Sequence, residues 1–123
     1  MILLPSSVQV HVALEPTNLH KSFEGLSNAV RAVVGRDPLS GHVFCFMNRR
    51  RTALKLLVWT RGGFTIVHKL LECGRFTFVA DVKPGVRSVE IGADELAMLL
   101  EGIDARSARR SPRWSRELPA VAT

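Results

Sequence analysis

The sequence predicts a single α+β domain, in which a mostly antiparallel β-meander sheet is packed by one amphipathic helix, with a shorter acidic helix near the C-terminus. Three observations support this class. The chain has 123 residues, of which 46% are hydrophobic, so it is long enough for one core and too short for two. Residues 42–80 contain four runs rich in Val, Ile, Leu, Phe and Thr, separated by short breaks that carry Gly or Arg. Apolar residues recur at three- and four-residue steps before and after this region.

The first element is a strand at about 7–14, because Val8, Val10, Val12 and Leu14 alternate with their neighbours. Pro16 ends this strand, since proline cannot donate to a ladder. Thr17 offers an N-cap for a helix at about 18–34, and Gly35 is a natural stop. The apolar face of this helix consists of Phe23, Leu26, Val30, Val33 and Val34.

The meander is predicted to have strands at about 42–47, 54–60, 64–71 and 75–80. The breaks at 61–63 and 72–74 are short enough for tight hairpins. The break at 48–53 is longer and holds three consecutive arginines. It is predicted to be an exposed tip, because three arginines cannot be buried unpaired.

Val89 and Ile91 predict a short strand, and Ala93 or Asp94 begins the second helix. The buried stripe of that helix is predicted to be Leu96, Leu99, Leu100 and Ile103. The composition changes after residue 104, since 105–123 has five arginines, two prolines and no apolar period. We therefore expect one α+β domain over 1–104 and a flexible basic tail over 105–123.

Charge divides the chain into a basic sheet and an acidic second helix. The net charge is +6 and the isoelectric point about 10.4, which favours an anionic partner such as nucleic acid or a membrane surface. Residues 42–87 hold nine basic against two acidic residues, and 88–104 hold five acidic and no basic residues. The predicted nucleic-acid contacts are Arg49, Arg50, Arg51, Lys55, Arg61, Lys69 and Arg75. In the alternative interpretation, these bases only solvate the edges and turns of the sheet.

Other chemistry has little support in the sequence. The two cysteines, Cys45 and Cys73, are interpreted as reduced thiols, because no histidine lies at ligand spacing from them. Most carboxylates fall on the second helix or its ends, where solvated charge is the simpler interpretation. We therefore expect no catalytic residue, metal or cofactor. The N-terminal stretch predicts neither a signal peptide nor a membrane span, which favours a cytoplasmic protein.

Five motifs occur in a fixed order: PT-x-x-x-K-x-F-x-G-L, DP-x-SG-x-x-F-x-F, LK-x-L-x-W, K-x-L-E-x-GRF and LLEGID. They run from Pro16 to Asp104. With this order of motifs, the chain resembles the small accessory proteins, usually called TnpB, of bacterial insertion sequences of IS family sixty-six. These are distinct from the RNA-guided nuclease of the same name. The resemblance covers about residues 3–104.

The resemblance implies a non-catalytic role in transposition beside a separate, larger transposase that supplies the acidic catalytic residues. The implied partners are DNA at the terminal repeats of the element, the cognate transposase and a third small element-encoded protein. Two hypotheses follow. In the first, the basic sheet surface binds DNA. In the second, the chain is a protein–protein adaptor that docks on the transposase and makes little contact with DNA. The docking residues would then be Leu99, Leu100, Glu101 and Ile103. Self-association is left open.

The chain departs from the family pattern at four positions. The family's usual PTDMRK has Asn18 and His20 here in place of its acid and its arginine. Its usual KRLERGRF has Leu70 and Cys73 in place of two arginines. If these positions contact DNA or the transposase, we expect this copy to bind more weakly.

Overall fold

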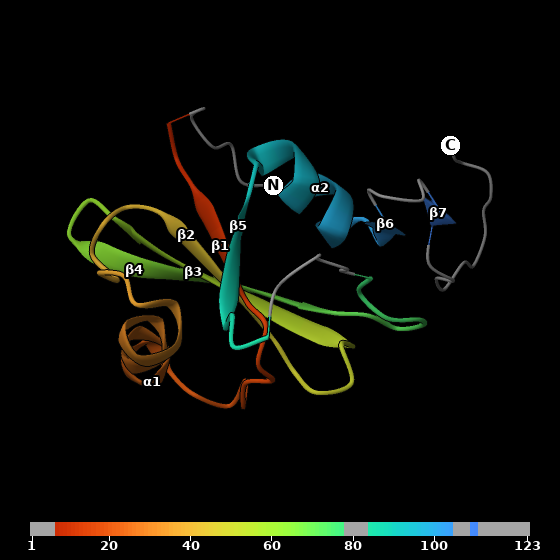
Figure 1. The fold of residues 1–123 in the computed structure, drawn as a ribbon, viewed down its shortest axis with the longest axis horizontal. Coiled ribbons are helices and arrows are strands. Elements are labelled where there is room, and N and C mark those ends of the chain that lie inside the picture. The colour runs from red at the N-terminus through yellow and green to blue at the C-terminus, as the bar shows by residue number, and fades with distance from the viewer. Residues whose placement is uncertain (1–6, 78–83, 105–108, 111–123) are drawn as a thin grey trace.

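The computed structural model describes residues 7–77, 84–104 and 109–110, and its architecture confirms the predicted α+β class (Figure 1). A five-stranded sheet has the order β4-β3-β2-β1-β5. Its strands are β1 (Val10–Ala13), β2 (Val43–Met47), β3 (Ala53–Thr60), β4 (Gly63–Leu70) and β5 (Ser88–Ile91). The helices are α1 (Phe23–Ala29), the π-helix η1 (Val30–Val34) and α2 (Ala93–Leu100). A separate two-residue ladder joins β6 (Ile103–Asp104) to β7 (Arg109–Arg110).

The sheet is mostly antiparallel with one parallel pair. Strands β2, β3 and β4 form a meander, and β1 lies parallel to β2, with Val10 opposite Val43. A parallel pair needs a crossover connection, and α1 with η1 supplies it. Strand β5 then returns to pair antiparallel with β1. The first and last strands of the sheet are therefore neighbours.

The first helix begins later than predicted. Ser22, not Thr17, stands at its N-cap, because the backbone N–H of Thr17 donates to the carbonyl of Met47 at 2.9 Å. The side chain of Asn18 accepts from the N–H of His20 at 3.0 Å, which makes a local turn in place of a helical one. The predicted stop at Gly35 is confirmed, with φ of 73° and an N–H bonded to the carbonyl of Val30.

The meander has three strands, so the prediction of a fourth at 75–80 was wrong over 75–77, where the chain forms no strand. The rest of that range lies outside the described residues. The backbone N–H of Phe76 donates to the carbonyl of Arg51 at 2.7 Å, and its side chain is buried. Since Phe76 bonds to the β2–β3 connection and not to β4, the segment leaves the sheet there.

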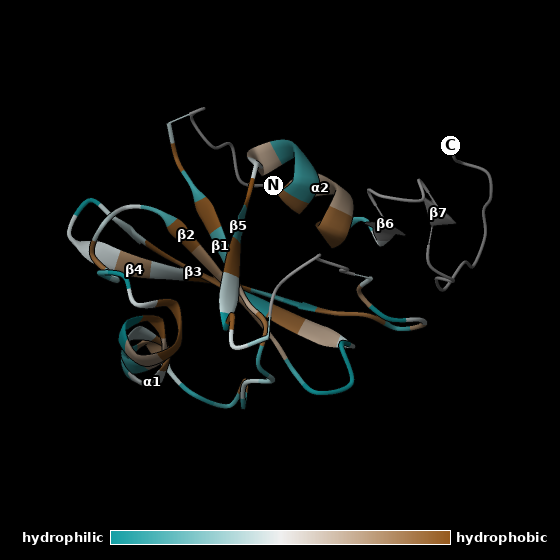
Figure 2. Ribbon diagram, viewed as in Figure 1, coloured by the Kyte–Doolittle hydropathy of each residue, from teal (hydrophilic) through white to brown (hydrophobic). Residues whose placement is uncertain are grey.

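Each face of the sheet packs against a helix (Figure 2). On one face, Leu26 and Val30 of the first helical segment contact Phe44, Phe46 and Leu57. On the other, Leu96 and Leu99 of α2 join a cluster with Val43 and Cys45. Neither face of the sheet is therefore left open over its whole area.

The boundary predicted at residue 104 stays a prediction, since most of 105–123 lies outside the described residues. In the parts of the chain that the structure describes, no helix has the length and apolar character of a membrane span.

Candidate nucleic-acid interface

The arginine-rich connection between β2 and β3 is held together by one side chain, Asn48. Its Oδ1 accepts from the backbone N–H groups of Thr52 and Ala53 at 2.9 and 3.1 Å. Its Nδ2 donates to Oγ1 of Thr52 at 3.1 Å. Arg51 takes a left-handed conformation with φ of 58°, and its N–H bonds to the carbonyl of Asn48. These contacts define a compact tip over residues 48–52.

A second segment docks on this arginine tip. The N–H of Leu71 donates to the carbonyl of Thr52 at 2.8 Å, and Phe76 reaches the carbonyl of Arg51 as described above. Buried Phe76 anchors the segment and is adjacent in sequence to Arg75. Arg49, Arg50 and Arg75 are exposed, and Arg51 is half-buried. Four of the seven predicted contact residues therefore lie at one end of the sheet.

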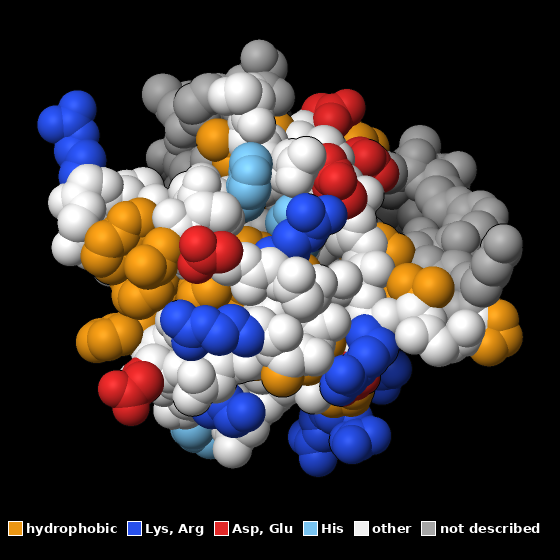
Figure 3. Space-filling model, turned by 60° about the vertical axis from the view of Figure 1, so that its left-hand side comes forward, with side chains coloured by type: hydrophobic (Ala, Val, Ile, Leu, Met, Phe, Trp, Pro, Cys, Tyr) orange, Lys and Arg blue, Asp and Glu red, His pale blue; other side chains and the backbone are white. Residues whose placement is uncertain are grey.

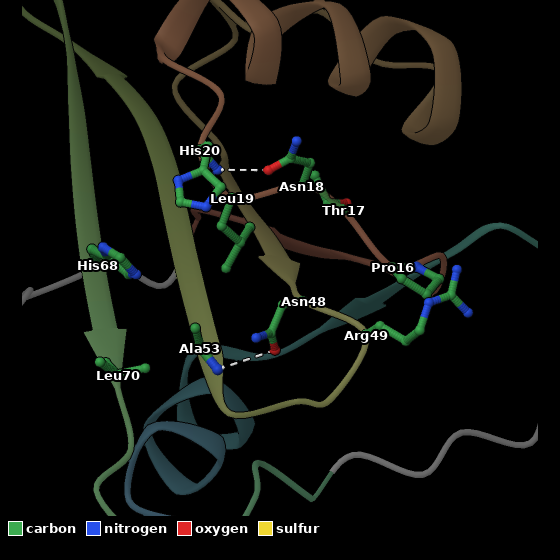
Figure 4. A pocket seen from close by; sticks show the side chains of 10 residues that line it. All are labelled: Pro16, Thr17, Asn18, Leu19, His20, Asn48, Arg49, Ala53, His68 and Leu70. Carbon is green, nitrogen blue, oxygen red and sulfur yellow. Dashed lines mark hydrogen bonds between the residues drawn. The ribbon is translucent and has the colours of Figure 1, made fainter.

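A groove of about 520 Å³ lies beside the tip (Figure 4). One wall is the 16–20 segment that precedes α1, and the other is formed by the tip and the end of β4. In Figure 4, Leu19 points into the groove and the rings of His20 and His68 lie on one side of it. Ten residues line it: Pro16, Thr17, Asn18, Leu19, His20, Asn48, Arg49, Ala53, His68 and Leu70.

None of those ten lining residues is acidic. Lys55 lies directly across from His68 in the β3–β4 ladder and extends the basic character along the sheet. Three of the four departures from the family pattern, Asn18, His20 and Leu70, line this one groove. Neither His68 nor the structural role of Asn48 was predicted from the sequence. The two-residue 61–62 turn could have revealed the position of His68. Such a turn sets the register of the hairpin, and this register places His68 beside Lys55.

The two predicted sheet lysines lie on opposite faces. Lys55 Nζ donates to the carbonyl of Lys21, on the face that α1 covers. Lys69 Nζ donates to the carbonyl of Leu100, at the C-terminal end of α2. A lysine there complements the partial negative charge of the last helical carbonyls. Both amines therefore already have partners within the fold.

Arg61 lies at the far end of the β3–β4 hairpin from the tip. Arg61 and Gly62 have φ of 46° and 79°, as in a type I′ turn. The eight residues of β3 separate this turn from the tip by roughly 24 Å. On the side of the molecule shown in Figure 3, Lys and Arg side chains form separate groups and not one continuous patch. The tip with Arg75 is the group that the fold assembles from several segments.

The predicted docking residues are differently exposed. Leu99 is 2% exposed and belongs to the core, Leu100 is half-buried and Glu101 is exposed. Ile103 belongs to β6. A partner at this surface would thus meet the acidic exterior of α2, where Asp94 and Glu95 are also exposed.

Two buried titratable groups lie outside the tip and the groove. Burial in the sheet, together with the charge of Arg36, lowers the pKa of His11 below its ordinary 6.5. Burial raises the pKa of the Cys45 thiol to about 12. Within the described ranges, no three His, Cys, Asp or Glu residues are placed to hold a metal ion.

The fold defines a small sheet protein with a helix on each face and a basic tip at one end. Residues 8–110 match the family model described as IS66 Orf2 like protein. The chain belongs to this family, which consists of transposition-associated accessory proteins and is not known for catalysis.

Two relatives from Sinorhizobium fredii (strain NBRC 101917 / NGR234) are similar over most of their length. The uncharacterized protein y4jC is 29% identical over 105 residues, which cover 85% of this chain and 87% of y4jC. The uncharacterized protein y4hO is 32% identical over 114 residues, which cover 90% of this chain and 96% of y4hO. No solved structure matches the chain significantly.

Proposed function

We propose that this protein is a non-catalytic accessory factor of transposition that binds DNA at the ends of its element, beside a separate transposase. The observation that carries the proposal is the tip, which places Arg49, Arg50 and Arg75 in solvent at one end of the sheet next to a groove lined without acids. Arginine is well suited to phosphate because its planar guanidinium donates in a fork.

Phosphate contacts should dominate this binding, because the arginines project from a turn and not from an element shaped for a groove of the duplex. Each phosphate neutralised on B-DNA contributes a slope of about −0.9 in log affinity against log salt. The tail beyond residue 104, with its five arginines, is expected to add further salt-sensitive affinity.

The test measures affinity for the terminal repeats over a range of salt concentrations. The double variant Arg49→Ala, Arg50→Ala should bind more weakly on every sequence and lose about two units of salt slope. The control is Arg31→Ala, Arg36→Ala, which removes the same charge from exposed positions away from the tip and should change the slope much less. Equal effects of the two double variants would contradict the proposal.

A second candidate is an adaptor that docks on the transposase. The exposed acidic residues of α2, Asp94 and Glu95, favour it, because they form a surface of opposite charge to the tip. Capture of the cognate transposase that survives nuclease treatment and is lost in Asp94→Asn would support the adaptor. Capture that requires DNA would exclude it.

A further inference from the structure

Strand β4 is a long edge strand. It has eight residues, whereas β5 at the opposite edge has four. Gly63–Leu70 contains no proline and no acidic residue, and its one lysine, Lys69, turns to the carbonyl of Leu100. Proline and outward charge are the usual devices that keep an edge strand from pairing with another chain. Strand β4 therefore presents a backbone that can accept another strand.

The hairpin geometry shows which backbone groups point outward. Gly63 pairs with Thr60 across the type I′ turn, so Gly63 faces β3. The N–H of Leu71 also faces β3, because it donates to the carbonyl of Thr52. Backbone direction alternates along a strand, so the odd-numbered residues bond to β3. The outward N–H and C=O groups belong to Phe64, Ile66, His68 and Leu70.

Exposed apolar side chains lie at both ends of this strand on one sheet face. Leu70 is 65% exposed at the C-terminal end. At the N-terminal end, Phe23 is 54% exposed and stacks on Phe64 with ring centroids 5.8 Å apart. An exposed apolar area is visible in Figure 3. Among the described residues, only Leu39 and Val86 are other large apolar side chains with comparable exposure. The Phe23–Phe64 pair and Leu70 thus lie at opposite ends of one edge strand. A second copy that pairs antiparallel can cover both ends.

We propose that β4 is a homodimer interface, in which two copies pair antiparallel through their β4 strands into one continuous ten-stranded sheet. Only the even-numbered residues of β4 have backbone N–H and C=O groups that point outward. They must therefore form hydrogen bonds with even-numbered residues of the second copy. The register that places Phe64 opposite Leu70 also places Ile66 opposite His68, with Val67 on the two-fold axis. In this register, the apolar N-terminal end of each β4 lies against the apolar C-terminal end of the other. The contact therefore occurs twice, as a two-fold interface requires. Lys69 then faces Thr65, so no like charges lie directly opposite.

Leu70→Asp tests the contact in the full chain without nucleic acid. Sedimentation analysis should find a concentration-dependent dimer for the unsubstituted protein and a monomer for this variant. Leu39→Asp is the matched control, because Leu39 is also exposed, at 48%, but lies outside β4; it should remain a dimer. An unsubstituted protein that is monomeric at every concentration would overturn the proposal, as would a dimer that Leu70→Asp leaves intact.

His68→Pro tests the backbone pairing separately from the side chains. Because the N–H of His68 points out of the sheet, proline removes no bond to β3 and is tolerated there, as on other edge strands. The variant should keep its circular dichroism and a cooperative thermal transition but lose the dimer. Retention of the dimer would show that the copies meet elsewhere.

A cysteine at the two-fold axis tests the register. In Val67→Cys with Cys73→Ser, the two introduced cysteines should face each other with Cα atoms about 4.5 Å apart, within the range for a disulfide. A mild added oxidant should link the copies covalently. Thr65→Cys in the same background faces Lys69 and should not cross-link. Linkage through position 65 and not 67 would contradict this register.

Discussion

At the scale of single residues, His11 is the clearest polar anomaly of the core. It is 3% exposed, stacks on Phe44 with centroids 5.5 Å apart, and its Nε2 is buried without a hydrogen-bond partner. A buried, unpaired polar atom costs stability. Because burial lowers its pKa, the folded chain holds His11 neutral while the unfolded chain protonates it near pH 6.5.

Stability should therefore fall as the pH drops below about 6.5 toward the lower pKa of the folded state, because the unfolded state binds the extra proton. His11→Phe should weaken this dependence and leave stability at pH 7.5 unchanged or higher, since an aromatic ring stays stacked on Phe44. Denaturant titrations of both proteins at several pH values between 5 and 8 measure the free energy of unfolding and its pH dependence. An identical pH dependence in the two proteins would rule His11 out as the cause.

The carboxyl of Glu15 would not obscure the result. Its hydrogen bond with Arg87 lowers its pKa below 4.5, so its contribution is lost only at more acid pH.

At the scale of elements, the tip depends on Asn48 more than on its arginines. Asn48→Ala leaves two backbone N–H groups without their acceptor and should cost about 1–3 kcal/mol. It should also weaken the proposed DNA binding, because the arginines lose their fixed positions. Asn48→Asp keeps an oxygen that can accept from both N–H groups but adds a negative charge among the arginines. It should therefore fold better than Asn48→Ala and still bind DNA poorly. Chemical denaturation and binding titrations of both variants measure the two effects, and normal stability in Asn48→Ala would contradict the assigned role.

The sequence predicts local elements well and long-range partners poorly, for physical reasons. Strand β3 alternates its side chains between two packed faces, and Gly35 ends its helix by adopting φ of 73°, so both were readable from their neighbours. The pairing of β1 with β5 joins Val10 to Ile91, and no local pattern encodes a contact across so many residues. The opposite placement of Lys55 and Lys69 was readable in principle, because a two-residue turn fixes which residues face each other. The groove could not be predicted, because it depends on the hydrogen bond between Thr17 and Met47, which only the folded chain shows.

At the scale of the whole molecule, Cys45 reports on global opening. It is fully buried in the central strand β2, and its pKa is raised to about 12, whereas Cys73 is exposed. A thiol reagent at pH 8 should label Cys73 at once and Cys45 only through unfolding of the sheet. In Cys73→Ser, the logarithm of the labelling rate should therefore fall linearly with the free energy of unfolding across a series of variants. Fast labelling of Cys45 in the native protein would mean that the sheet opens locally.

The pairing of the first strand with the last also determines when the chain can fold during synthesis. While the ribosome makes residues 14–87, β1 lacks the neighbour that covers one of its edges, and Leu96 and Leu99 of α2 are not yet there to complete the core beside it. The sheet closes only after nearly the whole domain has emerged, so contacts of high sequence separation set the pace of folding. A frameshift or stop codon anywhere before residue 100 should therefore leave an aggregation-prone fragment and not a partly active protein.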